Sequence, residues 1–89
     1  MKMQPKKVVE VEDEGLLALL GEQVTFFCLN YIYTGKLVGV NDTCVKLESP
    51  QIVYETGSFS DSNWKDAQHL GTDEFYISTT CIESFGVMK

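Results

Sequence analysis

The sequence predicts a mainly β domain: a small, strongly bent, five-stranded barrel that follows an N-terminal helix. Three observations carry this prediction. From residue 22 onward, apolar residues recur with a period of two. Turn-forming residues interrupt that alternation at short intervals, which is typical of barrels and sandwiches rather than of βαβ folds. Two glycines, Gly35 and Gly39, fall inside one predicted strand, where they indicate the bends or bulges that a small curling sheet requires.

The chain has 89 residues, which is enough for one domain and one core. Residues 1–12 are predicted to be a basic, flexible segment, because three lysines lie among the first seven residues. Residues 13–89 are predicted to form the single domain. Within it, residues 57–72 are a polar insert that is rich in Ser, Asp and Gly.

The helix is predicted near residues 13–20. The acidic run 12–14 stands at its start, where carboxylates complement the helix dipole, and Gly21 stands at its end. Residues 8–11 remain open between helix and strand, because the β-branched pair Val8 and Val9 suits either structure.

The strands follow in order. Val24, Phe26 and Cys28 fall on one face of the first strand, and Asn30 ends it in a tight turn. The remaining predicted strands are 32–40, 43–48 with a resumption at 51–55, 75–78 and 81–85. Serine or aspartate at 60–62 is a suitable cap for one helical turn at 63–68 in the insert.

The net charge of the chain differs from that of typical nucleic-acid-binding proteins. The net charge is −6, with 13 acidic residues against seven lysines and no arginine. Without Lys2, Lys6 and Lys7, residues 8–89 carry four bases and 13 acids, a net charge of −9. Nucleic-acid-binding proteins normally carry a basic surface, and arginine is their usual reader of phosphates and bases.

No continuous apolar segment follows the basic start, and the longest apolar run, 16–20, is far too short to span a membrane. We therefore expect neither a signal peptide nor a membrane association. Cys28, Cys44 and Cys81 are odd in number and widely spaced, which predicts free thiols and a cytoplasmic location.

The residues do not predict an enzyme, a metal site or a cofactor. No C-x-x-C or H-x-x-H pair is present, the cysteines lie in predicted strands, and His69 falls in a polar loop. No glycine run has the spacing of a phosphate-binding loop. Phe59 and Trp64 stand out in the polar insert, where they either fold back over one end of the barrel or contact a partner.

The segments 16–48 and 75–85 resemble the two motifs of the Sm-like (LSm/Hfq) family. The likeness consists of a helix ending at Gly21, the alternation from Val24 to Cys28, a glycine at Gly35 and two short strands joined by a tight turn near Thr79. A fainter resemblance is to the small Sm-like proteins of phages. The resemblance implies an SH3-like (Sm-like) barrel, with 57–72 as a variable insert loop.

The resemblance also implies that single-stranded RNA binds around the pore of a ring. The positions implied for RNA contact are Asn41, Thr43, Val45, Ser78 and Thr79, with Lys36 and Lys46 as the nearest lysines outside the tail. An alignment shifted by one residue replaces the first three with Asp42, Cys44 and Lys46. Neither alignment supplies the stacking aromatic or the base-reading asparagine of the family, and Ser78-Thr79 replaces its Arg-Gly pair.

Protomers of the family assemble through edge strands. Unpaired edges invite pairing with another chain, and head-to-tail contacts form rings when the rotation closes. The residues predicted to lie at this protomer interface are Phe75, Tyr76, Ile77, Cys81, Ile82 and Phe85. We therefore expect a ring-shaped homo-oligomer that binds single-stranded RNA. The alternative is an oligomeric structural or protein-interaction module that has lost RNA binding.

Overall fold

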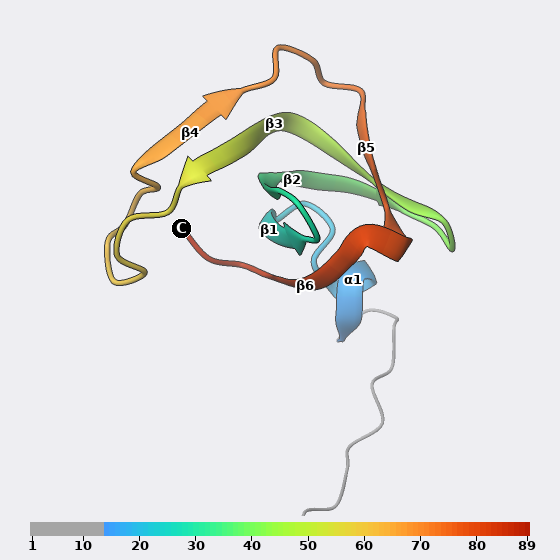
Figure 1. Ribbon diagram of the computed structural model, residues 1–89. Coiled ribbons are helices and arrows are strands. Elements are labelled where there is room, and N and C mark those ends of the chain that lie inside the picture. Colours follow the sequence, from blue (N-terminus) through green and yellow to red (C-terminus); the bar gives the residue numbers. More distant parts are fainter. Residues whose placement is uncertain (1–13) are drawn as a thin grey trace, which may run out of the picture.

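The computed structural model describes residues 14–89, which form a mainly β structure as predicted (Figure 1). The predicted basic segment 1–12 lies outside the described residues. The elements along the chain are α1 (Gly15–Ala18), β1 (Gln23–Cys28), β2 (Ile32–Val40), β3 (Cys44–Glu55), β4 (Asp66–His69), β5 (Phe75–Ser78), the 3₁₀ turn η1 (Thr79–Cys81) and β6 (Ile82–Gly86).

The strands form one antiparallel sheet in the order β4-β3-β2-β1-β6, and β5 pairs with the edge of β3 that faces away from β2. The long strand β3 has two partners on the same side of the sheet: its first half pairs with β5 and its second half with β4. Figure 1 shows β3 arching over β1 and β6. The sheet curls but is not closed, because no pairing within residues 14–89 joins β6 to β4 or β5.

Gly35 lies where the backbone of β2 is close to β3. The pairing of β2 with β3 shifts register between Thr34 and Lys36, as predicted for a glycine bulge. A Cβ at position 35 would lie 3.2 Å from Leu47 Cβ and 3.2 Å from Pro50 Cα. The bend therefore needs a residue without a side chain, because the facing strand already fills the space.

The core lies inside the curl of the sheet. Val24 and Phe26 of β1 are fully buried, and Cys28 packs partly against them, in agreement with the predicted strand face. The buried residues of the core cluster are Leu16, Val24, Phe26, Leu37, Val45, Leu47 and Ile77. Leu16 comes from α1, so the helix covers one end of the core.

Two predictions of local structure are wrong. The insert contains no helical turn at 63–68, since its residues 66–69 form β4. The cause is β3, which continues through Pro50 to Glu55 and leaves the edge of its second half open for pairing. The sheet therefore has six strands rather than five. The helix spans only Gly15–Ala18, because Gly15 has a φ of +75° and the chain turns again after Ala18.

No helix in residues 14–89 is both long and apolar enough to cross a membrane.

Candidate functional site: the loops and edges around η1

Two loops that are distant in the sequence meet at one end of the sheet. The Thr79 backbone N–H donates a 2.9 Å hydrogen bond to the carbonyl of Thr43. The Thr79 hydroxyl donates a 3.1 Å hydrogen bond to the carbonyl of Asp42. The pairing of β3 with β5 sets this contact, since Cys44 lies opposite Ser78. Four of the positions implied by the resemblance, Asn41, Thr43, Ser78 and Thr79, are thus adjacent in space.

Asn41 shapes the first of these loops. Its side-chain oxygen Oδ1 accepts hydrogen bonds from the Thr43 backbone N–H at 2.8 Å, the Thr43 hydroxyl at 3.0 Å and the Cys44 backbone N–H at 2.9 Å. This is an Asx turn, in which the side chain takes the place of a backbone acceptor. The acceptor of Asn41 is therefore committed to the loop.

The other three positions implied for RNA contact are placed differently. Val45 is fully buried in the core, so its side chain faces away from any ligand. The Nζ of Lys46 lies 5.6 Å from the ring centroid of Tyr76, a cation–π contact across β3 and β5. Lys36 lies in the middle of β2 opposite Glu48, five residues before Asn41. At the usual rise of a strand, that separation is roughly 16 Å.

The edges of β5 and β6 lie on either side of η1. Within residues 14–89, β5 pairs only with β3 and β6 pairs only with β1, so each keeps one unpaired edge. Of the predicted interface residues, Tyr76 is 54% exposed and Phe85 is 40% exposed. Ile77 belongs to the core, and Phe75, Cys81 and Ile82 pack partly against it. Tyr76 and Phe85 are therefore the two predicted interface residues whose side chains are exposed.

Cys28 at the end of β1 lies beside Cys81 of η1. Burial is the main cause that raises the pKa of Cys28 to about 11, and the neighbouring Cys81 thiol, which is hydrogen-bonded to it, is the next cause. Burial also raises the pKa of Tyr33, and the charge of an ionised Cys28 nearby is the second cause of this increase. A raised pKa keeps the Cys28 thiol protonated, so its environment opposes the thiolate that a nucleophile or metal ligand needs. Residues 14–89 contain no cluster of three His, Cys, Asp or Glu side chains suited to a metal ion.

A second cluster occupies the insert. Phe59 and Trp64 form an edge-to-face pair with ring centroids 6.2 Å apart. Lys89 reaches this pair from the end of the chain, and Figure 1 shows that end lying beside the 56–64 loop. Phe59 and Trp64 were predicted either to fold back over one end of the barrel or to contact a partner. Neither alternative included a contact with a lysine of the same chain. No local signal in the sequence links Lys89 to the insert, because the contact joins residues that are 25 or more positions apart.

No protein-family model matches this chain, and no curated protein matches it significantly. Functional inference therefore rests on the geometry of the site and on the resemblance in sequence.

Proposed function

We propose that this protein is a non-enzymatic assembly module of Sm-like architecture that forms a ring-shaped homo-oligomer. The observation that carries the proposal is the pair of unpaired edges, β5 and β6, separated by the three residues of η1. Each edge presents unpaired backbone donors and acceptors, which another chain satisfies by strand addition. Pairing β5 of one copy with β6 of the next uses both edges of every copy once the ring closes.

The order of pairing supports the Sm-like assignment. In the Sm-like barrel implied by the resemblance, two short strands joined by a tight turn close the structure. Here β5 and β6 are the short strands, η1 is the turn, and the two strands pair with β3 and β1 respectively. In this assignment β4 is an addition that extends β3, and the five remaining strands are those of the barrel.

Light scattering coupled to gel filtration tests the assembly. At tens of micromolar, the protein is expected to elute with a mass that is a multiple of the 10.0 kDa protomer. Tyr76→Glu places a charge on the β5 edge and is expected to reduce that mass, since edge charges oppose strand addition. Lys46 lies opposite position 76 and pairs with the new carboxylate, so the fold is retained.

Tyr54→Glu is the matched control, because Tyr54 is a similarly exposed tyrosine that belongs to β3 rather than to β5 or β6. A wild-type mass of 10.0 kDa at this concentration would overturn the ring. If Tyr76→Glu has the same mass as wild type, β5 does not form the contact between protomers.

A second candidate function is binding of single-stranded RNA at the two loops. The supporting observation is that Thr43 and Thr79 share a hydrogen bond, which brings four of the implied contact positions together. Against it stand the four lysines and ten acidic residues of the described part, 14–89. Titration of labelled oligouridine, with oligoadenine as control, at two salt concentrations distinguishes the two functions.

For RNA binding, uridine-selective affinity is expected to fall as salt rises, and Lys46→Gln is expected to weaken it more than Lys36→Gln, because only Lys46 lies near the loops. Absence of binding at low salt would contradict RNA binding and would leave the assembly module as the proposed function.

A further inference from the structure

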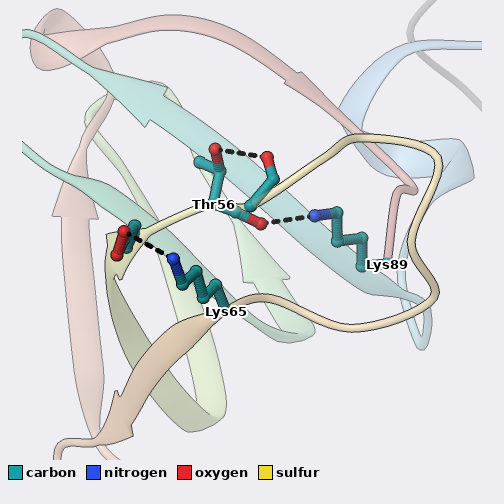
Figure 2. Close-up of polar contacts among 5 residues, drawn as sticks. Thr56, Lys65 and Lys89 are labelled. Atoms are coloured by element: carbon teal, nitrogen blue, oxygen red, sulfur yellow. Dashed lines mark hydrogen bonds and ion pairs between the residues drawn. The ribbon is translucent and has the colours of Figure 1, made fainter.

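The ammonium group of Lys89 lies in a site that residues 56–64 build around it. The Lys89 Nζ donates a hydrogen bond to the carbonyl oxygen of Thr56 at 2.6 Å (Figure 2). It donates a second one to the carbonyl oxygen of Ser58 at 2.8 Å. It also lies 4.4 Å from the ring centroid of Trp64 and 5.3 Å from that of Phe59. A primary ammonium has three N–H donors and is attracted to aromatic faces, so this site matches its chemistry.

We propose that the 56–64 loop is a binding site for a primary ammonium group. Lys89 is its occupant within the chain, and a lysine side chain of a partner protein replaces Lys89 when the partner docks. The proposal stands apart from the ring and from RNA, because the site consists of residues 56–64 and Lys89, none of which is a predicted interface or RNA-contact residue.

The site is formed by contacts that do not involve Lys89. The Asp61 backbone N–H donates to the Ser58 carbonyl at 3.1 Å, and the Lys65 backbone N–H donates to the Thr56 carbonyl at 3.3 Å. Gly57 has a φ of +67°, which turns the chain between the two acceptor carbonyls. A preformed site requires little ordering when a ligand binds, so the loop retains its acceptors when Lys89 leaves.

The surrounding charge favours a cation. Residues 14–89 hold ten acidic residues and four lysines. Lys65, the other lysine of this region, forms an ion pair with Glu55 at 3.2 Å, which reduces its repulsion of an incoming ammonium (Figure 2). Asp61 lines the hollow next to Lys89, together with Phe59 and Met88. A basic partner is therefore attracted to the acidic described part of the protein, and an anionic one is repelled.

Two observations indicate that Lys89 is exchangeable. Val87 and Met88, which connect Lys89 to β6, are both exposed, so the tail is held chiefly through the lysine side chain. The Trp64 Nε1–H is buried and has no acceptor within residues 14–89. Buried donors are nearly always paired in native proteins. A docking peptide brings backbone carbonyls as well as a lysine, and in the proposed complex one of these carbonyls accepts the Trp64 hydrogen bond.

Fluorescence of Trp64 reports directly on the site, because it is the only tryptophan of the chain. Lys89→Gln removes the ammonium and is expected to change the Trp64 emission. Nα-acetyl-lysine amide is the probe, and it is expected to bind Lys89→Gln saturably and to restore the wild-type emission. Because Lys89 competes as a tethered ligand, wild type is expected to bind the probe about tenfold more weakly.

Lys65→Gln is the matched control, since it removes a lysine of the same region that does not contact the rings, and it is expected to behave as wild type. Adding Phe59→Leu to Lys89→Gln is expected to weaken probe binding severalfold, because one aromatic wall is lost. Amide shifts of residues 56–60 in ¹⁵N spectra provide a second readout.

Three results would overturn the proposal. The first is that Lys89→Gln and Lys65→Gln have the same Trp64 emission and that neither variant changes the amide shifts of residues 56–60 relative to wild type. The second is a response to the probe that does not saturate. The third is an equal response to tetramethylammonium chloride at the same ionic strength, because that cation has no N–H to donate to the two carbonyls.

Discussion

Thr25 and Thr34 form a buried hydrogen bond across β1 and β2. The Thr25 hydroxyl donates to Thr34 Oγ1 at 3.3 Å, and the Thr34 hydroxyl donates to the Val24 carbonyl at 3.2 Å. Both threonines are 1% exposed, and they are directly paired in the sheet. Two polar side chains are therefore accommodated at buried positions of the sheet because each donor has an acceptor.

Thr34→Val is expected to lower the free energy of unfolding by about 1–3 kcal/mol, because the buried Thr25 hydroxyl loses its acceptor. The double variant Thr25→Val/Thr34→Val is expected to cost less than the sum of the two single variants, since it leaves no stranded hydroxyl. Urea unfolding of all four proteins measures this cycle. Strict additivity would show that the two hydroxyls do not interact.

Gly35→Ala is expected to destabilise the fold by about 1–3 kcal/mol, the usual cost of overpacking. The added methyl lies 3.2 Å from the backbone of Pro50 and from Leu47 Cβ, so β2 and β3 must separate. Gly86→Ala is the control, because a Cβ there has no neighbour within 4 Å and the residue is also in a strand. Equal unfolding midpoints in urea for the two variants would contradict the close approach at Gly35.

Asn41→Ala is expected to lower the free energy of unfolding by about 1–3 kcal/mol, because two backbone N–H groups and one hydroxyl lose their shared acceptor. Asn41→Asp keeps an oxygen at the same place and is expected to retain most of the stability. Thermal unfolding of the three proteins compares them. Similar losses for both variants would indicate that the amide nitrogen, rather than the oxygen, supports the turn.

The raised pKa of Cys28 predicts that the protein loses stability at high pH. Its pKa is about 11 in the folded protein against an ordinary value of 9.0, so the native state holds the proton more tightly than the unfolded state. Below pH 9 both states are protonated and the thiol adds no pH dependence. As the pH rises from 9 toward 11 the unfolded thiol ionises first, and the free energy of unfolding falls.

Cys28→Ala isolates this effect from the titration of lysines and tyrosines, which both proteins share. Between pH 8 and pH 10.5, under reducing conditions, wild type is expected to lose more stability in urea than Cys28→Ala. Parallel pH profiles would indicate that the thiol is solvated in the native state.

Local patterns were sufficient for several strands. The strand predictions at 32–40 and 75–78 agree with β2 and β5, because alternation and turn residues define both ends of each. The resumption after Pro50 proved to be one continuous strand, β3. The helical turn predicted at 63–68 is wrong because Asp66–His69 has no apolar alternation that would indicate a strand. Pairing of these residues with β3 outweighs their local preference.

Local patterns predict the mainly β class, the face of β1 that enters the core and the bend at Gly35, because each depends on neighbours along the chain. The folded arrangement was needed to see that Val45 is buried, that Thr43 contacts Thr79 and that Lys89 enters the 56–64 loop. These contacts depend on how the strands curl and pair. A side-chain alternation of period two specifies which residues share a face, and the curl of the sheet determines what that face meets.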